Sequence, residues 1–270
     1  MSYCCLTRNS IAILILLVLL GLNVPVTFGL TMSSSIADHV SDSFRVLGVC
    51  GGIGSGKSTA CKLLVSSCNC LEHIDADSIA HSVYAPGSQT VKDVVANFGE
   101  DILVQHDDDD TAPMEIDRKK LGAIVFAERS AMAKLEAIVW PHVKTLLADK
   151  IEQLRGEWTT APAKQKLPIV ILEAAILLDA GWDDMLDGVW AVTVPREDSL
   201  ARLMETRGLT SEEVLKRIDA QESRRGIGNL QEELDDGVVT SVIVNDGSLD
   251  DLEQSLKKSL DDPSCWKYSR

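Results

Sequence analysis

The residues with the most distinctive spacing run from Gly51 to Ser58 and read GGIGSGKS. They fit the pattern G-x-x-x-x-G-K-[ST], whose glycines let the backbone turn its N–H groups inward as a nest for phosphate. In that pattern Lys57 reaches the β- and γ-phosphates, and the hydroxyl of Ser58 can bind Mg²⁺. The motif therefore predicts binding of ATP or GTP with Mg²⁺. The predicted nucleotide contacts are Gly52, Ile53, Gly54, Ser55, Gly56, Lys57, Ser58 and Thr59.

Acidic side chains follow two other apolar runs of the chain. Asp75 and Asp77 lie in the segment HIDAD, and Glu173 comes directly after LPIVIL. Because parallel strands end at the same edge of a sheet, these carboxylates would lie near the phosphate loop. There an aspartate can orient an acceptor hydroxyl and take its proton, or hold Mg²⁺, and Glu173 suits an acid beside Mg²⁺. Helix capping is the alternative for either aspartate, and a helix-start position is the alternative for Glu173.

A group of arginines follows the fourth apolar run. Small-molecule kinases close such a segment over the phosphates as a lid, and its arginines stabilise the transferring charge. The alternative is a pair of solvated amphipathic helices. A phosphate loop alone does not separate kinases from GTPases, ATPases or inactive nucleotide binders, so the carboxylates and this segment are what favour a kinase. The arginines are Arg202, Arg207, Arg217, Arg224 and Arg225.

Short apolar runs alternate with longer helical patterns along the chain. Continuous β-branched runs predict strands that are buried on both faces, and the helical segments between them predict parallel pairing. The predicted fold class is therefore α/β, with a parallel sheet flanked by helices. The expected strands are 46–50, 71–74, 167–172, 189–194 and 241–244, and the expected helices are 59–65, 117–126, 131–153, 196–206, 211–224 and 249–260. Thr210, with Glu213 three residues later, predicts a capped start for one of these helices.

From about Arg45 to Leu260 the chain resembles the dephospho-CoA kinase family. The segments that carry the resemblance are GVCGGIGSGKST, HIDADSIAHSVYAPGS, NFGEDIL, IDRKKLGAIVF and VNDGSLDDL. Two further segments, ILEAAILLDAGWDD and VWAVTVP, are more similar to the kinase domain of the animal bifunctional CoA synthase than to the usual bacterial form.

The resemblance implies ATP-dependent phosphorylation of the ribose 3′-hydroxyl of dephospho-CoA, which gives CoA and ADP in the last step of CoA biosynthesis. It implies a P-loop kinase fold in which residues 84–145 form a helical acceptor-binding region and residues 196–230 form a lid. Asp77 would orient or deprotonate the acceptor hydroxyl. The other implied roles are acceptor binding by Asp75 and Arg118, catalysis by Lys57, Arg202 and Arg217, adenine contact by Asn245 and Gly247, and Mg²⁺ binding by Ser58 and Glu173.

The chain departs from the family pattern at several places. Thr206-Arg207 stands where many members have Arg-Asp, which displaces a lid arginine by one residue, or about 100° around a helix. Glu173 replaces a usual Asp, Ala175 replaces a usual Pro, and Trp140-Pro141-His142 replaces a usual His-Pro. Two other functions stay open: a kinase acting on another nucleoside or nucleotide, and a nucleotide-binding scaffold without catalysis.

The N-terminal residues form a separate segment. Residues 11–22 read IAILILLVLLGL, a run shorter than the about 20 residues that a helix needs to span a bilayer. A basic residue precedes the run and small residues follow it, as in a secretory signal peptide. We expect a signal peptide or membrane anchor at 1–30, attaching through 11–28 if it anchors, a linker or transit segment at 31–44, the kinase domain at 45–262 and a tail at 263–270. The expected locations are the secretory route, an organelle such as a plastid, or a membrane-anchored form, and otherwise the cytoplasm.

The net charge of −15 arises from 41 acidic and 26 basic residues. Such an acidic chain is a poor candidate for binding nucleic acid, which needs basic surface, so the expected partner is the small-molecule acceptor. The excess acid lies in residues 93–117 and 231–270, whereas residues 196–225 hold seven residues of each sign. The acidity therefore does not argue against an anionic substrate. The seven cysteines show no paired spacing that suggests zinc, and we expect reduced thiols.

Overall fold

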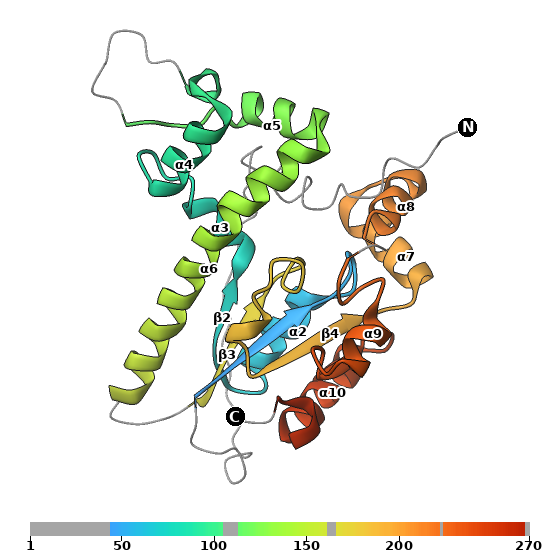
Figure 1. Ribbon diagram of the computed structural model, residues 1–270. Coiled ribbons are helices and arrows are strands. Elements are labelled where there is room, and N and C mark those ends of the chain that lie inside the picture. Colours follow the sequence, from blue (N-terminus) through green and yellow to red (C-terminus); the bar gives the residue numbers. More distant parts are fainter. Residues whose placement is uncertain (1–43, 105–112, 161–165, 222–223, 268–270) are drawn as a thin grey trace. The chain divides into compact units, whose positions relative to one another are not determined.

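The computed structural model describes residues 44–104, 113–160, 166–221 and 224–267 (Figure 1). Within them, five parallel strands form one sheet in the order β2-β3-β1-β4-β5. This order places β1, which leads into the phosphate loop, at the centre of the sheet between β3 and β4. Each predicted strand is confirmed: β1 (Arg45–Cys50), β2 (Cys70–Asp75), β3 (Leu167–Glu173), β4 (Gly188–Thr193) and β5 (Ser241–Val244).

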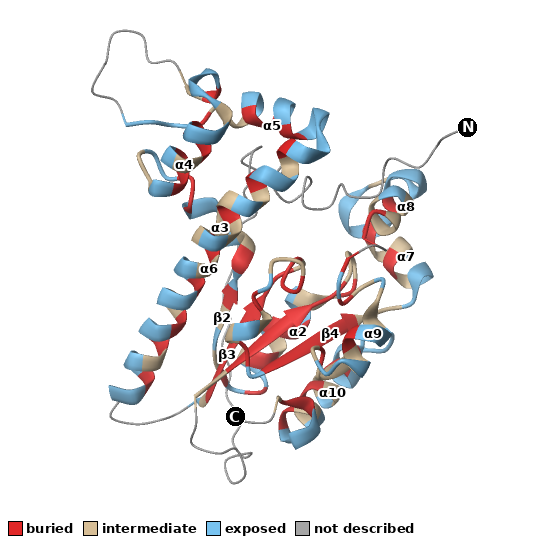
Figure 2. Ribbon diagram, viewed as in Figure 1, coloured by how far each residue is buried: buried red, intermediate tan, exposed pale blue. Residues whose placement is uncertain are grey.

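The central strands are buried on both faces, as their continuous apolar runs predict (Figure 2). On one face, helices α2 (Lys57–Ser66) and α10 (Leu249–Asp261) pack against Leu47, Ile171 and Trp190. On the other face, Leu186 and Leu177 approach Gly48 so closely that a side-chain carbon there would lie 2.4 and 2.9 Å from them. Water is thus excluded from both faces, which is the usual environment of a parallel sheet.

The described chain divides into two compact units. The first holds the sheet and consists of the described residues within 44–75 and 151–267, and the second consists of those within 76–150. The region expected to bind the acceptor, residues 84–145, falls within the second unit. The long helix α6 (Arg129–Thr160) contributes residues to both units.

Helices dominate the second unit. It contains α3 (Ala76–Ser82), α4 (Gln89–Phe98), the short turn η1 (Glu100–Ile102), α5 (Arg118–Ala127) and the first part of α6. The hydroxyl of Ser88 caps α4 by accepting a hydrogen bond from the N–H of Val91 (3.2 Å), and the carboxylate of Asp117 caps α5. The sequence pattern predicts α5 and α6 but misses α3 and α4, because α3 is short and the valines of α4 have low helix propensity.

Between β4 and β5, the described residues form the helices α7 (Arg196–Arg207), α8 (Ser211–Asp219) and α9 (Leu230–Asp235). The capped start of α8 is confirmed, because Thr210 Oγ1 accepts from the Glu213 N–H and Glu213 Oε2 accepts from the Thr210 N–H. The prediction that this helix runs to residue 224 is wrong. It ends at Asp219, and the chain then turns so that Gln221 reaches the phosphate loop.

Folded structure continues beyond residue 262, where we expected a tail to begin. The short turn η3 (Pro263–Cys265) follows α10, and both Cys265 and Trp266 are buried in the core. The indole Nε1 of Trp190 donates a hydrogen bond to the carbonyl of Cys265 (2.9 Å). The C-terminal turn is therefore part of the first unit.

Some expectations fall outside the described residues. These are the signal peptide or anchor and most of the linker, within residues 1–43. The membrane attachment expected through residues 11–28 lies there too. Within the part of the chain that the structure describes, no helix combines the length and apolar character needed to cross a membrane.

Candidate functional site

The phosphate loop joins the end of β1 to the start of α2, as the motif requires. Two of its glycines are obligatory because of their surroundings. Gly51 has φ of 143°, and a side-chain carbon there would lie 2.2 Å from the carbonyl oxygen of Val192. Gly56 has φ of 89°, and a side-chain carbon there would lie 2.2 Å from Asn245 Nδ2. Any larger residue at either place would distort the loop.

Three side chains from distant parts of the sequence hold this loop. Gln221 Oε1 accepts a hydrogen bond from the Ile53 N–H (2.6 Å), and Ser199 Oγ donates one to the Ile53 carbonyl (2.7 Å). Asn245 Nδ2 donates to the carbonyl of Ser55 (2.8 Å). All three side chains are buried. Sequence reasoning singled out Asn245, as an adenine contact, but missed Ser199 and Gln221, for which no local signal exists.

Positive charge gathers at the start of α2. Lys57 Nζ donates hydrogen bonds to the carbonyls of Gly51 (2.9 Å) and Gly52 (3.2 Å), which keep the ammonium inside the loop. Arg202 of α7 donates to the carbonyl of Asn245 (2.8 Å), and its Nη1 lies 3.9 Å from the position of a side-chain carbon on Gly56. The structure thus brings Lys57 and Arg202 together at the loop, where helix α2 also presents its positive dipole end.

The predicted carboxylates end two neighbouring strands. Asp75 and Glu173 are register partners at the ends of β2 and β3, so both lie at the sheet edge that carries the loop. Ser58 Oγ donates a hydrogen bond to Glu173 Oε1 (2.7 Å), and His73 Nε2 lies 3.0 Å from Glu173 Oε2. The sequence therefore placed Ser58 and Glu173 correctly beside each other.

The electrostatics of Glu173 favour its ionised form. Burial by itself would raise the pKa of this carboxyl, but the contacts with His73 and Ser58 and the charge of Lys57 outweigh burial, so the pKa lies below its ordinary value. Burial and the neighbouring Glu173 carboxylate raise the pKa of the Cys61 thiol well above its ordinary range. At neutral pH the site thus holds a carboxylate and a protonated thiol.

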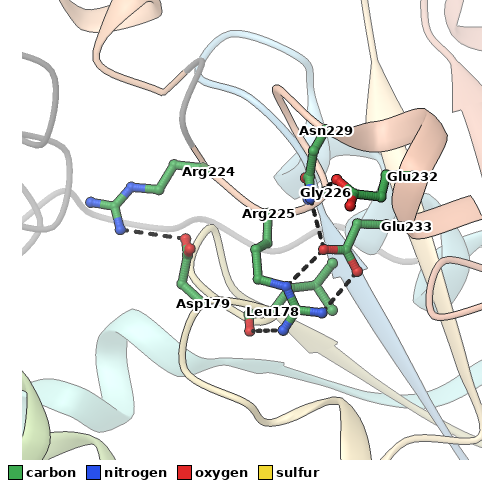
Figure 3. Close-up of polar contacts among 8 residues, drawn as sticks. All are labelled: Leu178, Asp179, Arg224, Arg225, Gly226, Asn229, Glu232 and Glu233. Atoms are coloured by element: carbon green, nitrogen blue, oxygen red, sulfur yellow. Dashed lines mark hydrogen bonds and ion pairs between the residues drawn. The ribbon is translucent and has the colours of Figure 1, made fainter. Parts of the chain in front are cut away.

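Two of the predicted lid arginines contact acidic side chains of the first unit (Figure 3). Arg225 binds the buried Glu233 through Nε (2.7 Å) and Nη2 (2.8 Å) and donates from Nη1 to the carbonyl of Leu178 (2.9 Å). Arg224 is buried and faces Asp179 at 3.4 Å. Both arginines therefore fix the segment before α9 to the turn after β3. Their expected role in closing over the phosphates stays a prediction.

Arg207 and Arg217 lie near each other on α7 and α8. Burial and the charge of Arg217 lower the pKa of Arg207. Two guanidinium groups that repel each other favour a shared anion between them. Arg207 is displaced by one residue from the position of the lid arginine in the family pattern. It nevertheless lies close to Arg217, which the resemblance assigns to the lid.

A cavity lies beside the phosphate loop in the first unit. Its walls come from the loop itself, the end of β4, and the segment that follows α8; they include Ile53, Thr193, Gln221 and Gly228. Ser199 and Gln221, which hold Ile53, also line it. The loop is thus open to a ligand on the side of the α7–α8 segment.

The remaining predicted residues lie elsewhere. Asp77 is in the first turn of α3, two residues after β2 ends, and Arg118 opens α5 with its guanidinium 5.9 Å from the ring centre of Tyr84. Both belong to the second unit. Gly247 lies just before α10. The roles of these residues toward the acceptor and the adenine stay predictions.

Comparison with known proteins identifies the family. Residues 45–251 match the family model described as dephospho-CoA kinase. The dephospho-CoA kinase of Geobacter sulfurreducens is 36% identical over 214 residues, which cover 79% of this chain and 96% of that protein. The enzyme of the same name from Latilactobacillus sakei is 35% identical over 215 residues, covering 80% and 94%.

Solved structures agree with the sequence comparisons. The protein TT1252 from Thermus thermophilus is 30% identical, with a TM-score of 0.56, and the match covers 80% of this chain and 96% of that one. The dephospho-CoA kinase from Campylobacter jejuni is 25% identical, with a TM-score of 0.51 and coverage of 79% and 94%. The family model spans most of the chain and these relatives are matched over nearly their whole length, so this chain belongs to the dephospho-CoA kinase family.

Proposed function

We propose that the protein transfers the γ-phosphoryl group of ATP to the 3′-hydroxyl of dephospho-CoA, giving CoA and ADP. The observation that carries this proposal is the edge of the sheet where the phosphate loop, Ser58 and Glu173 meet. Family membership supports the choice of acceptor. The same edge is where ligands bind in open α/β sheets.

The phosphate loop would hold the triphosphate of ATP. Its inward N–H groups and the start of α2 attract negative charge, and Lys57 adds a full positive charge. Arg202 lies beside the loop and would stabilise charge on the transferring group, with Arg217 contributing from α8. Asn245 and Gly247 would border the adenine.

The oxygen donors beside the loop fit Mg²⁺. The Ser58 hydroxyl and the Glu173 carboxylate lie 2.7 Å apart, and Mg²⁺ prefers such oxygen ligands. When bound, the ion would neutralise charge on the β- and γ-phosphates. The hydrogen bond between the two side chains keeps these oxygen atoms side by side.

The residues that the resemblance assigns to the acceptor would bind it and position its hydroxyl. Asp77 orients the 3′-hydroxyl and accepts its proton as the oxygen attacks the γ-phosphorus. The new O–P bond forms while the bond from that phosphorus to the β,γ-bridging oxygen breaks, so ADP leaves. Asp75 and Arg118 would bind the acceptor, and residues 84–145 would enclose the CoA-like portion.

The direct test uses the purified protein with ATP, Mg²⁺ and dephospho-CoA. CoA should form, and ADP release should depend on the acceptor. Equal ADP release with other nucleosides or nucleotides would identify a different kinase, and ATP binding without turnover on any acceptor would identify an inactive nucleotide binder.

The role of Asp77 is tested by Asp77→Asn, which keeps the size of the side chain but cannot accept the proton. Turnover should fall by about 10²–10⁴-fold, the range typical of a general base. Asp101→Asn, at an exposed aspartate of η1, is the matched control. Full activity of Asp77→Asn would contradict the assignment.

Location is a separate proposal that rests on the apolar run at residues 11–22. The N-terminal segment would direct the protein into a membrane-bound compartment or attach it to a membrane through residues 11–28. Residues 1–44 fused to a fluorescent protein should leave the cytosol. A diffuse cytosolic signal would rule this out.

A further inference from the structure

Three side chains with metal-binding atoms meet beside the phosphate loop. They are Cys61 of α2, His73 of β2 and Glu173 of β3, and one donor atom from each lies within 4.8 Å of the others. The residues are far apart along the chain, so no spacing in the sequence reveals the set. Only the packing of α2 on the sheet brings the sulfur to the two strand residues.

The environment of these atoms suits a bound cation. Cys61 is fully buried, and Glu173 is 8% exposed. His73 Nε2 is a buried atom that makes no hydrogen bond of good geometry within the described residues, although Glu173 Oε2 is 3.0 Å away. Buried polar atoms are nearly always well satisfied, so a ring nitrogen whose contact with the neighbouring carboxylate has poor geometry, and which lies beside a thiol, calls for an explanation.

We propose that Cys61, His73 and Glu173 form a binding site for a borderline divalent metal ion, with Zn²⁺ preferred. Thiolate, imidazole and carboxylate are the three protein ligand types that Zn²⁺ uses, at about 2.0–2.3 Å. Mg²⁺ prefers oxygen ligands alone, so the sulfur and nitrogen discriminate against it.

The observed spacing suits such an ion. Bonds of that length place neighbouring donors of a tetrahedron roughly 3.3–3.8 Å apart. Donor atoms that lie within 4.8 Å of one another need shifts of only about an ångström to reach it. Water would take the fourth position, and the thiol proton would be released to solvent when the thiolate binds.

Occupancy of this site would inhibit the kinase. Glu173 is the carboxylate whose Oε1 contacts Ser58, and Zn²⁺ bound through Oε2 would withdraw negative charge from it and so weaken its hold on Mg²⁺. This consequence rests on the proposed role of Glu173, whereas metal binding itself does not. The two parts therefore need separate measurements.

Binding is tested on the full chain under reducing conditions with Co²⁺ as a spectroscopic substitute for Zn²⁺. Co²⁺ should produce a thiolate-to-metal charge-transfer band that added Zn²⁺ removes. Cys61→Ala should abolish the band. Because it removes a direct ligand, it should also weaken Zn²⁺ binding by more than the roughly 10–100-fold that loss of an outer-shell partner costs.

Controls separate this site from other thiols and from misfolding. Cys68→Ala, at another buried cysteine outside the set, should leave the band and the Zn²⁺ affinity unchanged. His73→Asn should weaken Zn²⁺ binding while the thiolate stays present, which keeps the test valid if Cys61→Ala does not fold. Far-ultraviolet circular dichroism and ATP binding identify folded variants. If Cys61→Ala and His73→Asn bind Zn²⁺ with the same affinity as the wild type, the proposal is overturned and the binding is adventitious surface binding.

The effect on catalysis is measured with Mg²⁺ in excess. Zn²⁺ should lower CoA formation by the wild type, and Cys61→Ala should retain its basal turnover and lose at least most of the Zn²⁺ sensitivity. Equal inhibition of both proteins would overturn the link to catalysis. A protein that binds Co²⁺ through its thiolate but makes no CoA would refute the proposed function and leave the metal site standing.

Discussion

Single hydrogen bonds from distant residues shape the phosphate loop. Ile53 has both of its backbone groups occupied, one by Gln221 and one by Ser199. Both partners are distant in the sequence: Gln221 lies 168 residues and Ser199 lies 146 residues from Ile53. The loop's geometry is therefore a property of the folded unit as well as of its glycines.

Gln221→Ala should loosen the loop. It leaves the Ile53 N–H without its acceptor, and an unsatisfied buried donor costs about 1–3 kcal/mol. We expect the KM for ATP to rise by roughly 5-fold or more, following that range of free energy, with a smaller change in the KM for the acceptor. Steady-state kinetics with each substrate varied would show it. Gln231→Ala, at an exposed glutamine of α9, should change neither constant.

The contact between Arg225 and Glu233 gives stability a dependence on pH. The hydrogen bonds from Arg225 lower the pKa of Glu233 below its ordinary value of 4.5. The ionised Glu233 makes its full contribution to the free energy of unfolding above the pKa that this carboxyl has in the unfolded chain. That contribution is lost as pH falls through the lower pKa of Glu233 in the folded protein. Glu233→Gln should therefore destabilise the protein by roughly 1.5–3 kcal/mol at neutral pH, and its difference from the wild type should shrink below pH 4.5.

Urea unfolding at several pH values would measure this. Glu205→Gln, at an exposed glutamate of α7, provides the control and should match the wild type throughout. A constant difference between Glu233→Gln and the wild type from neutral to acid pH would count against an ionic contribution from this pair.

At the level of elements, the strands follow from the sequence most completely. Runs such as VLGVC and LPIVIL are apolar without alternation, and only a strand covered on both faces requires that. The capped start of α8 follows equally well, because Thr210 and Glu213 are local partners. The end of α8 does not, since the contact of Gln221 with Ile53 is what interrupts an otherwise helical pattern.

In the candidate site, too, the residues marked by a local sequence pattern could be predicted, whereas those brought in by the fold could not. Ser58 and Glu173 could be placed because the motif and the strand ends locate both. Ser199 and His73 carry no pattern of their own and acquire their neighbours only when the strands and helices assemble. The arginines were ambiguous for the same reason: Arg225 differs from Arg202 only in what the fold places opposite it.

The C-terminal turn should matter for stability. Trp266 is 6% exposed and packs edge-on against Trp190, with ring centres 5.9 Å apart. Trp266→Ala should cost about 3–5 kcal/mol, as for other large-to-small changes of buried aromatic residues. Thermal and chemical unfolding would measure the loss. Lys258→Ala, on the exposed side of α10, should be nearly neutral, and equal stability of the two variants would show that the turn is dispensable.

At the scale of the whole molecule, the first described residues already pack against later parts of the chain. The ring of Phe44 packs against Trp158 at 6.3 Å, and Arg155 lies over it at 4.6 Å. The guanidinium of Arg45 lies 4.9 Å from the ring centre of Trp266. We expected the leader to end near residue 44. Phe44, at that boundary, and Arg45, the first residue of β1, thus both take part in the packing of the first unit.

Truncation should locate this boundary. A protein of residues 44–270 should fold and form CoA at the rate of the full chain, because the sheet and the loop are built from Arg45 onward. A protein of residues 47–270 loses the buried Val46 and all three ring contacts made by Phe44 and Arg45; loss of the valine alone should cost about 1.5–3 kcal/mol. Comparing melting temperatures of the two proteins would check this, and equal values would contradict it.

The attachment of Ile53 to Gln221 links two processes that are otherwise separate. Gln221 belongs to the segment after α8, so any ligand that displaces this segment also changes the free energy of arranging the loop around a nucleotide. Thermodynamic linkage makes such an effect reciprocal: the factor by which the acceptor changes ATP affinity must equal the factor by which ATP changes acceptor affinity. For an acceptor that moves this segment, the backbone N–H of Ile53 would connect the two binding events.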